Sequence, residues 1–138
     1  APGQSLSEAL LTPTRIYVKP LLAALKAGIG IKALAHITGG GFIDNIPRVL
    51  PDHLAAHVDL GAVKVPGVFG WLSRTGGMNE REMLRTFNCG VGMLVAVAPE
   101  DAQALVDHLG AAGETASIVG RLTARTGEPV TFDGALAL

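Results

Sequence analysis

A histidine and three glycines stand close together in the first third of the sequence. The segment from His36 to Phe42 reads HITGGGF. Glycines lack the Cβ atom that would keep an anion away from the backbone, and their N–H groups can line a concave site. A helix that begins directly after them would add free N–H donors. Gly39, Gly40 and Gly41 therefore favour a phosphate ligand, and a tight strand-to-helix turn without a ligand is the alternative.

Two side chains carry groups suited to the same site. His36 lies at the end of the strand predicted before the glycines, and ligands of open α/β sheets bind outside such ends. A hydrogen-bonded core histidine is the alternative. Arg15 could hold a phosphate through two parallel hydrogen bonds, or it could form a surface ion pair. The glycine spacing matches neither a Walker A loop nor a dinucleotide fingerprint.

A second polar segment reads RTFNCG at residues 85–90, directly before an apolar run. Thr86 and Asn88 are unusual at the end of a buried strand unless they have a partner, and local capping of the preceding helix is the alternative. Cys89 is the single cysteine, so no intrachain disulfide can form. We interpret it as a small buried hydrophobic residue rather than a nucleophile.

His53 and His57 stand four residues apart, as two metal ligands on a helix would. Pro51 precedes the pair and no Glu follows His53, so we interpret the pair as solvated surface. No residue of the chain is predicted to bind a metal.

Short helices and strands must position these residues. Residues 1–13 are predicted to form a linker or entry arm, because Pro2, Gly3 and Pro13 interrupt regular structure, and residues 14–138 form the predicted domain. Helices are predicted at residues 20–28, 42–46, 68–75, 80–85 and 99–109, and strands at residues 33–37, 55–60, 91–98, 116–121 and 129–133. Asn79 and Glu82 form a capping-box pattern for the fourth helix. The apolar run at 91–98 predicts a central strand buried on both faces.

The alternation of helices and strands predicts a layered α/β domain, in the α/β or α+β class, with helices around a mixed sheet. The chain has 138 residues, of which 49% are hydrophobic and 4% aromatic, enough for one aliphatic core. Because 11 Lys and Arg balance 12 Asp and Glu without a basic run, a nucleic-acid partner is disfavoured. Apolar runs are too short for a membrane span, and with no signal-peptide pattern a cytoplasmic location is expected.

Five longer segments, taken in order, resemble one enzyme family. They read LTPTRIYVKP at 11–20, AHITGGGF at 35–42, NIPRVLP at 45–51, VFGWL at 68–72 and RTFNCGVGM at 85–93. This order and spacing resembles the C-terminal half of phosphoribosylformylglycinamidine cyclo-ligase, the AIR synthetase of purine biosynthesis. The resemblance runs from about residue 8 to the end of the chain. The resemblance implies a Glu in many relatives at the position where this sequence has Asp44.

The resemblance implies the fold of that family's C-terminal domain and an ATP-dependent ring closure. ATP phosphorylates the formyl oxygen of formylglycinamidine ribonucleotide, the amidine nitrogen attacks the activated carbon, and phosphate leaves as aminoimidazole ribonucleotide forms. It also implies a homodimer, with an N-terminal domain that supplies most of the ATP site and the acidic Mg²⁺ ligands. The present chain is then expected to bind part of the ribonucleotide substrate without turning it over.

The resemblance further implies a role for each polar group. The phosphate- and substrate-binding residues would be Arg15, Thr38, Gly39, Gly40, Gly41, Asn45, Thr86 and Asn88. His36 would be the catalytic residue, orienting the reacting amide or transferring a proton. Formylglycinamidine synthase, selenophosphate synthetase, thiamin-phosphate kinase and a hydrogenase maturation factor share this type of domain, and the segments at 45–51 and 85–93 favour the cyclo-ligase among them. A non-catalytic α/β dimerisation module is the alternative from another class.

Overall fold

The strands of the computed structural model form two separate sheets. β1 (Ala33–His36) pairs antiparallel with β3 (Met93–Ala96). In the other sheet, β2 (Leu54–Asp59) lies in the middle, antiparallel to β4 (Gly120–Ala124) and parallel to β5 (Val130–Asp133). The predicted α/β class is confirmed, with its strands divided between a two-stranded and a three-stranded sheet.

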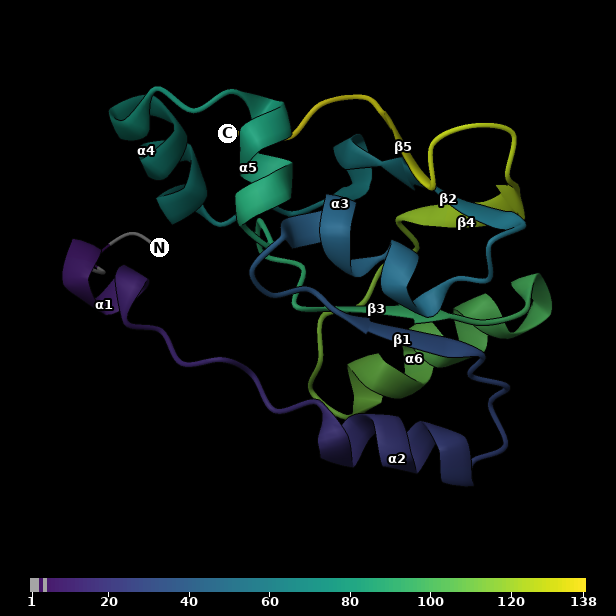
Figure 1. Cartoon of the computed structure of the whole chain (residues 1–138). Helices are drawn as coiled ribbons and strands as arrows, with labels where there is room; N and C mark the ends of the chain where they lie inside the picture. The colour runs from purple at the N-terminus through teal and green to yellow at the C-terminus, as the bar shows by residue number, and fades with distance from the viewer. Residues whose placement is uncertain (1–2, 4) are drawn as a thin grey trace.

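Helices connect and cover these strands (Figure 1). The structure describes residue 3 and residues 5–138, so Pro2 lies outside the described residues. The α-helices are α1 (Leu6–Leu10), α2 (Val18–Lys26), α3 (Gly41–Asn45), α4 (Gly67–Gly76), α5 (Glu80–Thr86) and α6 (Ala102–Ala111), and the 3-10 helices are η1 (Pro47–Val49), η2 (Leu60–Ala62) and η3 (Pro99–Asp101). Within the described part of the chain, no helix is long and apolar enough to cross a membrane.

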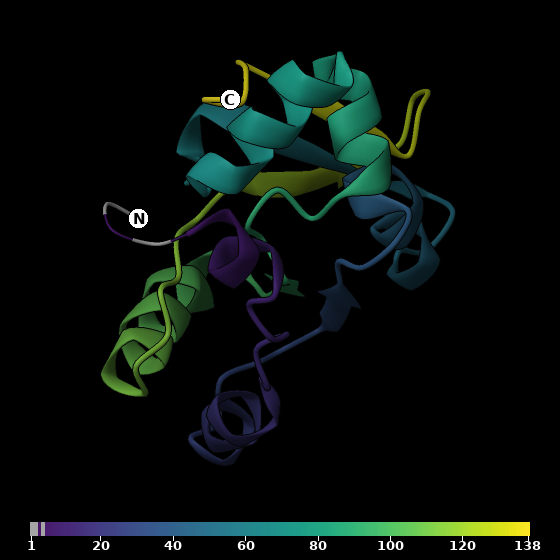
Figure 2. The same cartoon turned by 90° about the vertical axis from the view of Figure 1, so that its left-hand side faces the viewer.

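Two apolar clusters hold the elements together. The smaller one lies between α2 and α6, where Leu21, Ala24, Leu105 and Leu109 are buried at helical spacing. The larger one joins the three-stranded sheet to β1, α3 and α5, with Phe42 fully buried. α4 and α5 therefore lie on the opposite side of the molecule from α2 (Figure 2). Burial of each large aliphatic side chain stabilises this layered fold by roughly 1.5–3 kcal/mol.

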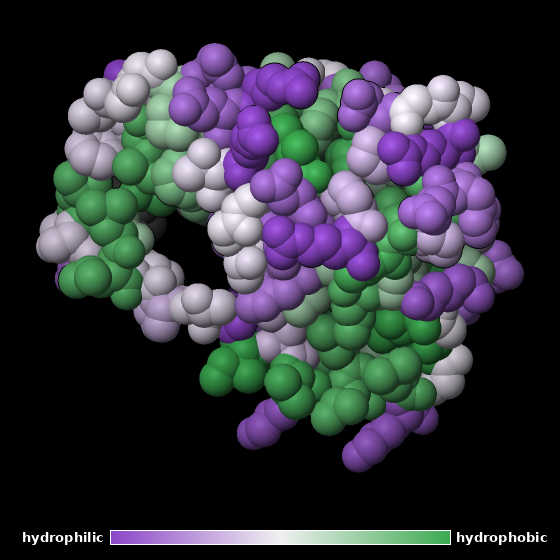
Figure 3. Space-filling model, viewed as in Figure 1, coloured by the Kyte–Doolittle hydropathy of each residue, from purple (hydrophilic) through white to green (hydrophobic). Residues whose placement is uncertain are grey.

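The surface of α2 is also apolar where no other element covers it. Val18, Leu22 and Leu25 are exposed on this helix, and Leu34 is exposed on the adjoining strand β1. Figure 3 shows this hydrophobic surface over the lower part of the molecule, where α2 lies. The helix thus buries one face against α6 and leaves a second apolar stripe at the surface.

The N-terminal segment contains a helix that the sequence analysis did not predict. α1 lies within residues 1–13, which were predicted to lack regular structure. The Ser5 hydroxyl accepts a hydrogen bond from the Glu8 N–H at 3.3 Å, and the Glu8 carboxylate accepts one from the Ser5 N–H at 2.8 Å. Hydrogen bonds from the Ser5 backbone and then its hydroxyl lower the pKa of Glu8. This capping box starts the helix, so Gly3 and Pro13 bound it rather than prevent it.

The prediction that β3 is a central strand is wrong. Among the residues that the structure describes, β3 pairs with β1 alone, and all four of its residues are half-buried. Its continuous apolar run has a different cause, since Met93 and Val95 pack on the smaller cluster and Leu94 on the larger one. The strand predicted at 116–121 is also displaced, because β4 begins at Gly120 and the preceding residues form the connection from α6.

Candidate functional site

The antiparallel pairing of β1 with β3 brings two loops to one edge of their sheet. The glycine loop, residues 38–41, follows β1, and the cysteine loop, residues 87–92, precedes β3. His36 is the register partner of Met93, and the Ile37 N–H donates to the Gly92 carbonyl at 2.9 Å. The structure therefore places side by side the two polar segments in which the family resemblance implies substrate-binding residues.

Asn45 holds the glycine loop from the inside. Its side-chain Nδ2 donates to the carbonyls of Gly41 at 2.8 Å, Gly39 at 3.2 Å and Thr38 at 3.4 Å. The Thr38 hydroxyl approaches the Asn45 Oδ1 at 3.5 Å. Because an amide has only two N–H donors, these three carbonyls share both of them. Asn45 is 6% exposed and supports the loop, with no donor left for a phosphate.

The three glycines have different surroundings. Gly40 and Gly41 have φ angles of 99° and 55°, which favour glycine, and the Gly41 N–H donates to the Thr38 carbonyl at 3.0 Å. A Cβ atom on Gly41 would overlap the Leu84 carbonyl, so this glycine allows α3 to pack on α5. The α-carbon of Gly39 faces open space. Among the described residues, the N–H groups of Gly39 and Gly40 donate to no backbone carbonyl, and these two remain as donors for an anion.

Asp44 limits the direction from which an anion could approach these donors. A Cβ atom built on Gly40 would lie 2.8 Å from the Asp44 Cβ and 3.1 Å from its Oδ2, so the carboxylate lies directly beside the loop. A negative charge at this distance repels a phosphate. An anion would therefore enter on the open side of Gly39.

The cysteine loop is held by contacts between residues that are two or three positions apart in the sequence. The Asn88 Oδ1 accepts a hydrogen bond from the Gly90 N–H at 3.0 Å, and the Asn88 carbonyl accepts one from the Val91 N–H at 2.8 Å. Gly90 has a φ angle of 97°, and a Cβ atom there would overlap Pro66. The Asn88 side chain thus forms an Asx turn with its own loop. Thr86 is exposed at the end of α5, next to this turn.

Cys89 occupies the centre of this loop and is fully buried. Its φ angle of 48° is positive, which is rare outside glycine, and its Sγ donates to the Met83 carbonyl at 3.7 Å. Burial, with a smaller contribution from the Glu80 charge, raises the pKa of the thiol to about 11. The thiol is therefore protonated at neutral pH, and the interpretation as a buried hydrophobic residue is confirmed.

His36 is exposed at the end of β1, so the alternative of a buried core histidine is excluded. Its ring lies 6.1 Å from the Tyr17 ring, centre to centre, at an interplanar angle of 76°. Tyr17 comes from the N-terminus of α2 and was not among the predicted site residues. The sequence offers one indication of its importance, since Tyr17 lies near Arg15 in the segment at 11–20. That position does not predict the contact with His36.

Arg15 lies in an ion pair rather than free beside the glycine loop. Its guanidinium Nη1 donates to the Glu114 Oε2 at 2.6 Å, with side-chain exposures of 55% and 17%. The alternative that Arg15 forms a surface ion pair is therefore confirmed. The pair joins the segment before α2 to the connection after α6, and the Glu114 carboxylate offsets part of the attraction between Arg15 and a phosphate.

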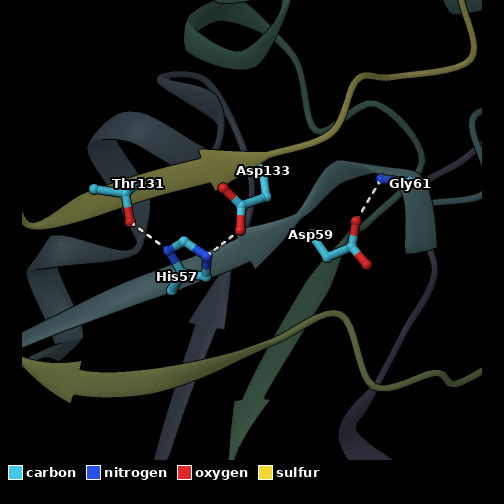
Figure 4. A network of polar contacts seen from close by, with 5 residues as sticks. All are labelled: His57, Asp59, Gly61, Thr131 and Asp133. Carbon is cyan, nitrogen blue, oxygen red and sulfur yellow. Dashed lines mark hydrogen bonds and ion pairs between the residues drawn. The ribbon is translucent and has the colours of Figure 1, made fainter.

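His53 and His57 do not share a helix face. His53 lies in a turn, and His57 lies on β2, where its Nδ1 is 2.8 Å from the Thr131 Oγ1 and its Nε2 is 2.5 Å from the Asp133 Oδ2 (Figure 4). With Nε2–H donating to the carboxylate, the Nδ1 of a neutral ring accepts from the hydroxyl. The register of β2 with β5 creates this network, so sequence spacing alone could not reveal it. The interpretation of His53 and His57 as a surface pair fits His53, which is exposed, whereas His57 is half-buried between the strands.

Hollows of the surface lie away from the two loops. A groove of about 360 Å³ runs between α3, α5 and β5, lined by Ile43, Arg81, Leu84 and Phe132 among others, and it includes no residue of the glycine loop. Among the described residues, no group of three or more His, Cys, Asp or Glu side chains is placed to hold a metal ion.

Together these features define a class of domain: an α+β fold whose two-stranded sheet presents glycine-rich backbone donors at one open edge. The sequence profile described as AIR synthase related protein, C-terminal domain, matches residues 1–133. The chain belongs to this family. The match confirms the resemblance of the motifs at the level of this family.

Proposed function

We propose that this chain is the substrate-binding half of a phosphoribosylformylglycinamidine cyclo-ligase. Its role would be to hold the ribonucleotide while ATP activates the formyl oxygen and the amidine nitrogen closes the ring. The observation that supports this proposal most strongly is the convergence of HITGGGF and RTFNCGVGM at one edge of the sheet, through Ile37 and Gly92. Both segments carry the family resemblance, and each provides polar groups to the same surface.

In this proposal the substrate phosphate binds on the open side of the glycine loop. The N–H groups of Gly39 and Gly40 would donate to it, together with the Thr38 hydroxyl, which is exposed. Asn45 would keep the loop in shape, and Thr86 and Asn88 would line the adjoining surface. Arg15 would be a weaker phosphate ligand than these groups, because the Glu114 carboxylate already offsets part of its charge.

His36 would act at the reacting end of the substrate. An exposed imidazole beside the loop can accept the proton that the amidine nitrogen loses when it attacks the activated carbon. The remaining contribution of the chain is to position anions and to stabilise developing charge through fixed backbone donors. ATP and Mg²⁺ would be bound by residues outside this chain.

Binding can be tested on this chain alone. We expect formylglycinamidine ribonucleotide to shift the backbone amide NMR signals of Gly39 and Gly40, and inorganic phosphate to shift the same signals at higher concentration. Replacing Asp44 with Asn should tighten phosphate binding by about fivefold, since a charge 4 Å away in a wet site contributes about 1 kcal/mol. Unchanged Gly39 and Gly40 signals at saturating ribonucleotide would contradict the proposal.

Turnover tests the catalytic assignment. In the complete protein, the His36→Ala variant should lose most of its rate of ring closure, whereas His53→Ala, which removes an exposed histidine outside the site, should not. A His36→Ala rate within about twofold of the parent, or ~0.4 kcal/mol of barrier, would show that His36 has no role in catalysis. The chain by itself should release no ADP from ATP and substrate, and Mg²⁺-dependent release at an ordinary enzyme rate would overturn the division of roles. Activity with the substrate of another ATP-using relative, and none with the ribonucleotide, would assign the chain to that relative.

A further inference from the structure

Tyr17 lies between His36 and the cysteine loop. Its ring is edge-on to the His36 ring, and its hydroxyl lies so close to Gly92 that a Cβ atom there would overlap the oxygen and come within 3.0 Å of Cζ. The Gly92 carbonyl in turn accepts the Ile37 N–H, one residue beyond His36. The tyrosine ring therefore touches both the side chain of His36 and the backbone that holds the end of β1.

Several contacts hold Tyr17 at this position. Its ring packs on the apolar cluster of α2 and α6, and it precedes the first residue of α2. Two residues before it, Arg15 is bound to Glu114, which lies 99 positions away in the sequence. Burial, followed by the Glu114 charge and opposed by Arg15, raises the pKa of the Tyr17 phenol, so the ring is neutral wherever the protein is folded near neutral pH.

His36 has few other restraints. It is exposed, it stands at the end of an edge strand, and among the described residues its ring forms no hydrogen bond. An imidazole in such a place samples several rotamers unless a neighbour limits them. An aromatic ring at edge-to-face distance favours one orientation of the imidazole over the others.

We propose that Tyr17 is a positioning residue for His36, and that Gly92 is glycine because the Tyr17 hydroxyl occupies the space of its side chain. The effect on turnover rests on the proposed function, whereas the effect on the His36 ring does not. The phenyl ring does the positioning, so phenylalanine should replace tyrosine and leucine should not.

The first experiment follows the His36 ring by NMR in this chain, using three-bond couplings to its β protons and cross-peaks to the residue 17 ring. We expect one predominant rotamer in the parent and in Tyr17→Phe, and more evenly populated rotamers in Tyr17→Leu. Gly92→Ala should also release His36, because the new methyl group displaces the tyrosine. The double variant Tyr17→Phe with Gly92→Ala should recover part of the order, since the overlapping oxygen is gone. Because Gly92→Ala retains the Tyr17 ring, this variant still tests the contact between Tyr17 and His36 if Tyr17→Leu does not fold.

A single His36 rotamer in both Tyr17→Leu and Gly92→Ala would overturn the proposal. Turnover of the complete protein then separates this inference from the proposed function. We expect Tyr17→Leu to lower kcat by about two- to tenfold with little change in KM, because the variant loses the orientation of His36 and not substrate binding. Tyr17→Phe should retain the parent kcat. If His36 is released but His36→Ala is fully active, the positioning stands and the catalytic role of His36 fails.

Discussion

The glycine loop and the cysteine loop lie side by side at one edge of the β1–β3 sheet, but their backbones are held in different ways. In the glycine loop, a buried amide from Asn45 reaches back to three carbonyls, and Gly41 packs against the carbonyl of Leu84 on another helix. In the cysteine loop, Asn88 bonds to the N–H of Gly90, two residues further on. The first loop depends on its tertiary neighbours, and the Asx turn of the second depends on its own residues.

Because of this difference, the glycine loop can present backbone N–H donors to a ligand, whereas the cysteine loop supports the glycine loop. Asn45 bonds to the carbonyls of the glycine loop, and among the described residues the N–H groups of Gly39 and Gly40 have no backbone acceptor. In the cysteine loop, the Gly90 and Val91 N–H groups are already bonded to Asn88. We therefore expect substitutions in the glycine loop to affect both stability and phosphate binding, and substitutions of Asn88 to affect mainly the local turn.

The largest expected effect is that of Gly41→Ala. The added methyl group would overlap the Leu84 carbonyl and would lie 2.8 Å from the Phe87 carbonyl, while the backbone has a φ angle of 55°. We expect a loss of about 4 kcal/mol or more in the free energy of unfolding, measured by urea denaturation. Gly39→Ala is the matched control, because its α-carbon faces open space, and it should change stability by less than about 1 kcal/mol. Equal effects of the two variants would contradict the comparison.

Asn45→Ala should have the next largest effect. The carbonyls of Thr38, Gly39 and Gly41 would lose the donor that they share in a buried place. We expect this loss to lower the free energy of unfolding by about 3 kcal/mol. Asn45→Asp has the same shape but no N–H donors, so it should be at least as destabilising. The shift in the midpoint of urea unfolding gives the loss in unfolding free energy. The dependence of this free energy on urea concentration should be unchanged if the denatured state is the same. Full stability of Asn45→Asp would show that the amide does not hold the loop.

The Cys89 thiol predicts a dependence of stability on alkaline pH. Its pKa is raised from 9.0 to about 11 in the folded protein, so the unfolded chain loses this proton first as the pH rises. The stabilisation is therefore complete below pH 9 and is lost between pH 9 and 11, with a size of about 2 kcal/mol. We expect the difference in unfolding free energy between the parent and Cys89→Ala to shrink by that amount from pH 8 to pH 11. A difference that is constant over this range would contradict a buried, protonated thiol.

Asn88→Ala should have the smallest effect of the set. It removes one hydrogen bond of 3.0 Å within a half-exposed turn, worth about 0.5–1.5 kcal/mol. Thermal unfolding should show a small downward shift, and the ribonucleotide-induced shifts of Gly39 and Gly40 should persist. A loss of stability as large as that of Asn45→Ala would mean that both loops depend equally on their asparagines.

Much of the local structure could be predicted from the sequence. Asn79 caps α5 by accepting the Glu82 N–H at 2.9 Å, as the capping-box pattern indicated, and the glycines do separate a strand from a helix. The helix α1 could also have been predicted, because Ser5 and Glu8 have the same spacing. Such features depend on residues three or four positions apart, so their physical cause lies within a short stretch of chain.

Other parts of the site could not be predicted, because their partners are distant in the sequence. Arg15 and Glu114 are 99 positions apart, and nothing in either segment indicates which charge will be paired. The apolar run around Leu94 looks like a central strand, although the same pattern arises when an edge strand lies between two apolar clusters. The network of His57 depends on the register of β2 with β5.

The order of residues along the chain sets where the polar groups gather: a histidine and three glycines after one strand, and a cysteine between Asn88 and Gly90 before another. The folded chain then sets what each group contacts. The Asn45 amide bonds to the loop carbonyls, the Gly39 and Gly40 N–H groups have no backbone acceptor among the described residues, and Tyr17 meets His36 with its ring and Gly92 with its hydroxyl. The physical reason is that residue type sets which bonds a group can form, whereas packing and strand register set which partner it meets.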